Sequence, residues 1–166
     1  MYLNESVKII PVSSEKKHIL ENLLSLYLHD LSEFADDLKI DINGKFQYEG
    51  LELYITKDEL KPFFIFLEDE IVGFIFVNTG KYVSKGIDFV VNEFFILKSF
   101  RRKGISAIAI KKLFDENKGK YEIEQLANNN IAINFWKKIY KVHEIEYEES
   151  IKMSDGFELY SQIFNI

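Results

Sequence analysis

The chain has 166 residues, of which 47% are hydrophobic and 15% aromatic, so it can form one domain with a sizeable core and is not a disordered chain. Its formal net charge of −6 argues against nucleic-acid binding, and the absence of cysteine excludes disulfides, thiolate metal sites and an acyl-cysteine intermediate. With no signal-peptide pattern and no apolar run long enough to cross a bilayer, we expect no membrane contact and a soluble, cytoplasmic protein, either a monomer or a homodimer.

The first third of the chain predicts a strand followed by helices. The short apolar run at 7–12, with Pro11 near its end, is typical of an edge strand. A helix should follow with Ser14 as its N-cap, because apolar residues recur at helical spacing from Ile19 to Leu31. We expect a second short helix over 30–38 and a loop over 41–50.

The rest of the chain alternates apolar runs with turn residues. Strands are predicted at 63–67 and 71–77, joined as a hairpin, and a polar turn at 80–86 leads into a long strand that ends at Leu97. A helix at 104–117, a strand at 121–126, a helix at 130–140 and strands at 144–148 and 157–164 complete the chain. This order predicts an α+β fold over residues 1–166, with a mixed, mostly antiparallel sheet between helices on both faces (α/β/α).

A basic turn precedes the helix expected at 104–117. Arg101, Arg102 and Lys103 stand directly before Gly104, and small residues follow. A helix N-terminus presents unpaired backbone N–H groups and a partial positive charge, and small side chains let an anion approach them. The pattern therefore indicates a site for a phosphorylated ligand, with an exposed solubilising patch as the alternative.

Two motifs resemble those of the GNAT (GCN5-related N-acetyltransferase) family, and the order of elements is similar to that family's. The family's Arg/Gln-x-x-Gly-x-Gly/Ala reads Arg101-Arg102-Lys103-Gly104-Ile105-Ser106 here, with Ser as the last small residue. Its Asn-x-x-Ala-x-x-Phe-Tyr reads Asn129-x-x-Ala132-x-x-Phe135-Trp136. The resemblance to bacterial stand-alone members implies an acyl-CoA N-acyltransferase fold in which two central strands splay apart.

The resemblance also implies where acetyl-CoA binds. The pyrophosphate would lie on the basic turn and helix start, and the pantetheine arm would pair with the backbone of the preceding strand. The implied cofactor-binding residues are Phe95, Ile96, Leu97, Arg101, Arg102, Lys103, Gly104, Ile105, Ser106, Ala107, Asn129 and Phe135. Backbone N–H groups near Ile96 and Leu97 would hold the oxyanion. The alternative is a strand paired along its whole length, because one sequence does not show a bulge.

Glu93 is the candidate catalytic base. Period-two alternation places Phe89, Val91, Glu93, Phe95 and Leu97 on one strand face, where an apolar environment would raise the pKa of the carboxyl. In similar acetyltransferases an acidic residue at this place takes the proton of the amine. The alternative is a carboxylate at a solvated edge or paired with a Lys or Arg.

The general acid is an open question. Similar enzymes use a Tyr after the Phe of the second motif to protonate the leaving thiolate, but here the position holds Trp136, whose indole N–H is far too weak an acid. Trp136 is therefore expected to pack. Tyr140, one helical turn later, water, or no acid at all are the alternatives.

These features predict an acetyl-CoA-dependent N-acetyltransferase that acts on a primary amine of a small molecule or peptide by direct attack, with no metal. The acidic residues Asp30, Glu33, Asp36 and Asp37 could attract a cationic amine, or form a solvated helix face. A CoA-binding sensor without turnover and a nucleotide-binding interaction domain are the rival functions. The sequence does not identify the acceptor.

Overall fold

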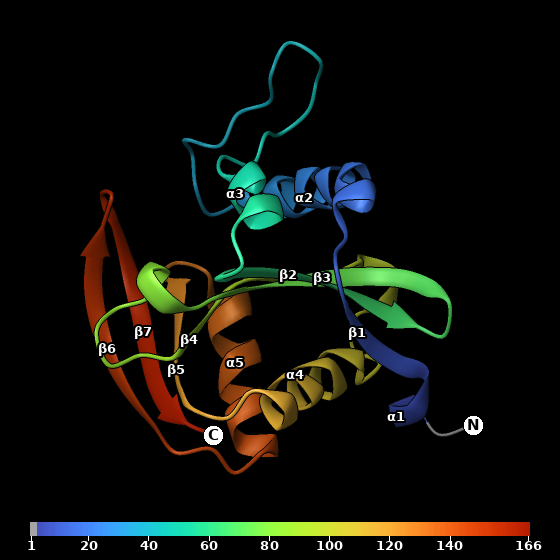
Figure 1. Cartoon of the computed structure of the whole chain (residues 1–166). Helices are drawn as coiled ribbons and strands as arrows, with labels where there is room; N and C mark the ends of the chain where they lie inside the picture. The colour runs from blue at the N-terminus through green and yellow to red at the C-terminus, as the bar shows by residue number, and fades with distance from the viewer. Residues whose placement is uncertain (1–2) are drawn as a thin grey trace.

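The computed structural model describes residues 3–166, and a seven-stranded sheet runs through its centre in the order β1-β2-β3-β4-β5-β7-β6 (Figure 1). Neighbouring strands are antiparallel except β4 and β5, which are parallel. The strands are β1 (Val7–Pro11), β2 (Leu60–Leu67), β3 (Glu70–Asn78), β4 (Phe89–Ile96), β5 (Lys120–Leu126), β6 (Tyr147–Ser154) and β7 (Phe157–Asn165). The predicted mostly antiparallel sheet, with the 7–12 strand at its edge, is confirmed.

Helices cover both faces of the sheet, as predicted. They are α1 (Leu3–Ser6), α2 (Lys17–Leu31), α3 (Leu51–Thr56), α4 (Ile105–Glu116) and α5 (Asn130–Val142). In Figure 1, α2 and α3 lie on one side of the sheet and α4 and α5 on the other. Each pair encloses its own core, because apolar stripes on the helices meet aromatic and β-branched side chains of the strands. None of the helices within residues 3–166 has the length and apolar content needed to span a bilayer.

Two local predictions near α2 are wrong. Ser14 does not cap the helix: it begins a 3₁₀ turn, Ser14–Lys16, which runs directly into α2. The second short helix over 30–38 is absent, and residues 32–38 form isolated turns instead. That acidic stretch buries little beyond Ala35, so it lacks the apolar stripe that would hold a helix on the sheet. The next helix is α3, which buries Leu51 and Tyr54.

The two central parallel strands part soon after they meet. β4 and β5 pair only at Phe89 with Tyr121 and at Val90 with Glu122, whereas β5 pairs with β7 along its whole length. Among residues 3–166, one edge of β4 therefore has no partner strand from Val91 onward. The splayed pair implied by the family resemblance is confirmed, and the alternative of a strand paired along its whole length is wrong.

A β-bulge in β4 lies where the strands part. Phe76 of β3 pairs with Glu93 and its neighbour Val77 pairs with Val91, so Asn92 is an extra residue on β4. An extra residue shifts the alternation of side chains between the two faces by one position. The two halves of β4 are therefore out of phase.

This bulge corrects the predicted face of β4. Phe89 and Val91 pack in the core shared with α4 and α5. Phe95 and Leu97 pack in the core under α2 and α3, and Glu93 contacts Tyr27 of α2. Glu93 thus shares its face with Phe95 and Leu97 but not with the two residues before the bulge.

Candidate active site

The carboxylate of Glu93 is held by two tyrosines from the layer above the sheet. Tyr27, on α2, donates a hydrogen bond to Oε2, and Tyr48, just before α3, donates one of 2.9 Å to Oε1. The Nδ2 atom of Asn92, the bulge residue, lies 3.3 Å from Oε1. The alternative of a carboxylate paired with Lys or Arg is not observed among residues 3–166, where the partners of Glu93 are neutral.

This environment changes the acidity of Glu93. Burial raises the pKa of the carboxyl to about 7, although the hydrogen bonds from Tyr27 and Tyr48 act in the opposite direction. The residue as a whole is only partly buried, so part of it is accessible to solvent. A carboxylate whose pKa lies near neutrality and which remains accessible is suited to accept a proton.

The open edge of β4 provides backbone donors beside Glu93. The N–H of Leu97 donates to the carbonyl of Val72 on β3, at 2.9 Å. Successive peptide groups of a strand point to opposite edges, so the N–H groups of Ile96 and Phe94 face the edge that β5 has left. The expectation that Leu97 contributes an oxyanion N–H is therefore wrong, whereas the N–H of Ile96 faces the open edge.

The basic turn has the backbone expected of an anion site. Gly104 is the N-cap of α4 with a left-handed φ of +81°, and Arg102 before it has φ +63°. We find no hydrogen bond from the backbone N–H groups of 102–107 to a distant part of the described chain. With Ser106 and Ala107 small and Ile105 turned into the core, the helix start can receive a pyrophosphate.

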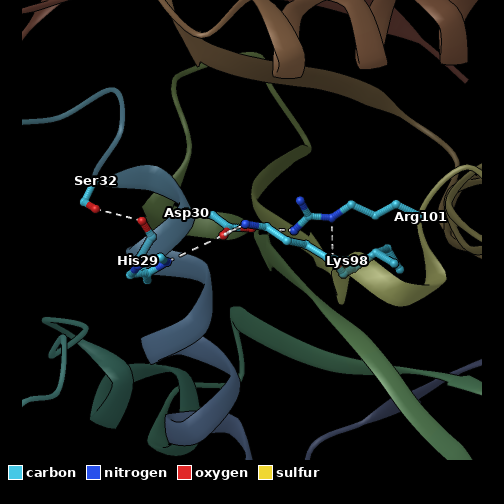
Figure 2. Close-up of polar contacts among 6 residues, drawn as sticks. His29, Asp30, Ser32, Lys98 and Arg101 are labelled. Atoms are coloured by element: carbon cyan, nitrogen blue, oxygen red, sulfur yellow. Dashed lines mark hydrogen bonds and ion pairs between the residues drawn. The ribbon is translucent and has the colours of Figure 1, made fainter.

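The side chain of Arg101 is held by contacts with other parts of the protein (Figure 2). Its Nε donates to the carbonyl of Ile96 at 2.7 Å, and its guanidinium donates to Asp30 of α2 at 2.6 Å. Lys98 also reaches Asp30, at 3.0 Å. The side chain of Arg101 is therefore held by contacts within the protein, whereas Arg102 and Lys103 are exposed.

Asp30 is charged in this arrangement. Burial alone would raise the pKa of its carboxyl, but the hydrogen bonds from Arg101 and Lys98 outweigh burial and lower it. Asp30 is thus the member of the predicted acidic cluster that has a defined structural partner. Glu33, Asp36 and Asp37 are exposed.

The end of α2 and the residues that follow it bridge the two sides of the splayed strands. In the last turn of α2, Asp30 binds Lys98 and Arg101, which follow β4. A few residues later the carbonyl of Phe34 accepts a hydrogen bond of 2.9 Å from Asn128, which follows β5. Residues 30–34 therefore connect the ends of the two parted strands.

Aromatic side chains of β4 and α5 pack together on the face of the sheet that α5 covers. Phe94 of β4 stacks on Phe135 of α5, with ring centroids 5.2 Å apart, and Trp136 packs on both. Asn129 accepts a hydrogen bond from the N–H of Ala132 at 3.0 Å and so caps α5. Trp136 packs as expected, and Phe135 contacts the part of β4 that β5 does not pair with.

Tyr140 lies deep in the core instead of facing the gap. It is 1% exposed, and its hydroxyl donates to Oε1 of Gln162 on β7 at 2.8 Å. Burial raises the pKa of the phenol above its usual value. A hydroxyl with a buried partner and a raised pKa is a poor proton donor, and this environment argues against the general-acid role considered for Tyr140.

Similarity to known proteins identifies the family. The model of the acetyltransferase (GNAT) family matches residues 20–140. The chain belongs to this family. It is therefore an acetyltransferase whose acetyl donor is acetyl-CoA. No curated protein matches the chain in sequence.

Solved structures show the GNAT fold over nearly the whole chain. An acetyltransferase from Thermus thermophilus superposes with a TM-score of 0.67 at 16% identity, and 97% of each chain is covered. The ribosomal L7/L12 alpha-N-protein acetyltransferase RimL, in complex with coenzyme A, gives 0.66 at 12% identity and covers 99% of this chain and 97% of its own. An N-acetyltransferase from Staphylococcus aureus Mu50 gives 0.65 at 14% identity, with coverages of 94% and 99%.

Sequence reasoning missed two residues of this GNAT site. Tyr27 belongs to the apolar stripe of α2, and its hydroxyl was the one sign that it could have a polar partner. Tyr48 lies in a stretch read only as loop, and nothing in the sequence connects it to Glu93. Within residues 3–166, no group of three or more His, Asp and Glu side chains is placed to hold a metal ion.

Proposed function

We propose that the protein transfers the acetyl group of acetyl-CoA to a primary amine by direct attack, with Glu93 as the base. The observation that carries this proposal is the carboxylate of Glu93, which has a pKa of about 7 and lies beside the open edge of β4. A carboxylate of that pKa can take a proton from an ammonium group near neutral pH and return it to solvent afterwards.

The proposed reaction assigns each group one task. Glu93 accepts a proton from the amine, whose nitrogen then attacks the thioester carbonyl. The N–H of Ile96 stabilises the negative charge that develops on the carbonyl oxygen. The C–N bond forms, the nitrogen of the tetrahedral intermediate releases its second proton to water, the C–S bond breaks, and the sulfur leaves with the bonding electrons. The chain has no Cys and no G-x-S-x-G motif, so the proposed reaction contains no covalent acyl-enzyme.

The proton for the leaving sulfur is proposed to come from water. Trp136 is too weak an acid, and the hydroxyl of Tyr140 is bound to Gln162 in the core. A thiol has a pKa near 8.5, so a free thiolate is a tolerable leaving group close to neutral pH. The reaction therefore does not require a dedicated acid.

An acceptor screen tests the proposal. Release of the CoA thiol is measured with acetyl-CoA and polyamines, aminoglycosides, amino acids or peptides with free N-termini. The similarity to RimL, which acts on a protein α-amino group, supports the inclusion of peptides with free N-termini in this screen. We expect turnover with at least one class and binding of CoA in the micromolar range, about −8 kcal/mol.

A CoA-binding module without turnover is the second candidate. It is favoured by one observation, Trp136 in place of the usual Tyr. This candidate predicts tight CoA binding with no thiol release from any acceptor. The first proposal would be contradicted by that result across all four classes.

A further inference from the structure

We propose that two copies of the chain associate through the outer edge of β6, which pairs with the same edge of a second copy as an antiparallel strand. β6 is the last strand of the sheet, beyond β7 (Figure 1). Within residues 3–166, no backbone hydrogen bond joins β6 to any segment other than β7. A strand with an unpaired edge is a template for pairing with another strand, and natural proteins normally protect such edges.

The opposite edge of the sheet shows this protection, whereas β6 does not. β1 has only five residues and ends in Pro11. β6 has eight residues, contains no proline, and pairs with β7 without a register shift. It also carries two large apolar side chains in solvent, Ile151 (58% exposed) and Met153 (68% exposed). A long, regular edge strand with exposed apolar side chains is a surface that a second strand would cover.

The charged side chains of β6 give its edge little further protection. Lys152 binds Glu122 and, at 3.1 Å, Glu124, so its ammonium group points back over the sheet toward β5. Glu149 accepts a hydrogen bond of 2.7 Å from Gln162 of β7. A charge protects an edge when an incoming strand would remove its water without offering a partner. These two charges already have partners within their own chain.

The turn between β6 and β7 indicates which backbone groups of β6 face outward. Asp155 and Gly156 form a two-residue turn in which both φ angles are positive, 50° and 84°. In a hairpin of this type the flanking residues, here Ser154 and Phe157, form a hydrogen-bonded pair, and the two kinds of pair then alternate along the strands. The residues of β6 whose N–H and C=O groups point away from β7 are therefore Tyr147, Glu149, Ile151 and Met153.

Charge favours one register for the paired strands. Two antiparallel copies related by a two-fold axis pair around one central residue. With Ser150 at the centre, Glu148 of each copy faces Lys152 of the other on the same face of the sheet. A lysine ammonium has three N–H donors, and the two glutamates of β5 use two of them. A centre at Glu148, Glu149 or Lys152 would place like charges opposite each other. A centre at Ile151 would leave Glu148 without a charged partner.

The test compares the mass in solution of the parent and of two edge variants. Ile151→Pro removes an outward N–H without removing a bond to β7, and Glu148→Lys puts like charges opposite each other. Sedimentation velocity over a range of concentrations should give twice the mass of one chain for the parent. Each variant should raise the Kd of the dimer at least about tenfold. The control Glu158→Lys makes the same charge change at an exposed position of β7 and should leave this Kd unchanged.

Hydrogen exchange examines the edge directly. The N–H groups of Glu149, Ile151 and Met153 should exchange fast in the dilute parent and slowly in the concentrated parent. Thermal unfolding checks that the variants are folded, and Glu148→Lys alone decides if Ile151→Pro is not.

Three results would overturn the proposal. The first is a parent that remains monomeric up to about 0.5 mM, whether or not its β6 edge binds a strand of another protein. The second is a dimer that the folded edge variants leave intact, because it would use another surface. The third is exchange of the three edge N–H groups that does not slow as the dimer forms.

Discussion

The hydroxyl of Tyr48 donates a hydrogen bond of 2.9 Å to Oε1 of Glu93, and the two residues lie 45 positions apart in the chain. Tyr27 donates to the other carboxylate oxygen. The tyrosines thus favour the charged form of Glu93, against the effect of burial. The balance between the two effects determines the pH range in which Glu93 can act as a base.

Replacement of Glu93 by Gln should remove the proton acceptor while keeping its shape. We expect CoA affinity to stay nearly unchanged and turnover at neutral pH to fall by about 10²-fold or more. The deficit should shrink at high pH, because an amine that is already deprotonated in solution no longer needs the carboxylate. The parent's kcat/KM should rise with pH with an apparent pKa near 7. Unchanged turnover on the true acceptor would show that Glu93 is structural.

Replacement of Tyr48 by Phe should shift that pH profile. Loss of a hydrogen bond to the carboxylate favours its protonated form, so the apparent pKa should rise above about 7. Activity should therefore fall more at pH below this value than above it. Tyr54→Phe is the control, because its hydroxyl bonds Asn78 rather than Glu93. A shift of equal size in both variants would contradict the specific role of Tyr48.

Replacement of Gly104 by Val should damage the anion site. Its φ of +81° is costly for a β-branched residue, and a side chain there would also crowd the phosphate. Gly86→Val is the control, since Gly86 has φ +85° and open space around it. Both variants should lose about 1–3 kcal/mol of stability. Calorimetry should show CoA affinity at least about tenfold weaker for Gly104→Val alone, a larger loss than for Lys103→Ala, whose charge is partly redundant with that of Arg102.

Replacement of Asp30 by Asn should loosen the contact between α2 and the basic turn. Because the pKa of Asp30 is lowered in the folded state, its contribution is present above the unfolded value of about 3.9 and is lost as the pH falls through the folded value. Denaturant unfolding at pH 7 should show a loss of roughly 1 kcal/mol, modest because the pair is partly exposed. The difference between parent and variant should vanish in strong acid. A constant difference at all pH values would argue against the ion pair.

Pattern and composition were sufficient for most of the fold. Apolar runs bounded by turn residues located β2, β3 and β5, and helical spacing located α2 and α5. The family motifs identified the turn before α4 and the start of α5. The helix predicted over 30–38 was wrong because a sequence shows charge and helix propensity directly. It does not show that the segment has no apolar face to bury against the sheet.

The site was harder to predict because it depends on the backbone and on distant pairs. The bulge at Asn92 is one residue on a strand of ordinary composition, yet it places Glu93 under α2. Arg101 and Asp30 are 71 positions apart, so no local pattern shows that one neutralises the other. The direction of the Leu97 N–H follows from its pairing with β3, which a sequence does not contain.

Trp136 is the single tryptophan of the chain. The centroid of its ring lies 6.0 Å from that of Phe94, on the part of β4 that β5 does not pair with, and 5.1 Å from that of Phe135. All of the protein's indole emission therefore comes from one buried ring beside the expected path of the cofactor arm. A ligand that enters the gap changes the polarity around this ring. The wavelength and intensity of the Trp136 emission should therefore change as the ligand binds. The protein thus carries an intrinsic fluorescent reporter of its own loading, and stopped-flow mixing can follow the rate of binding without a label.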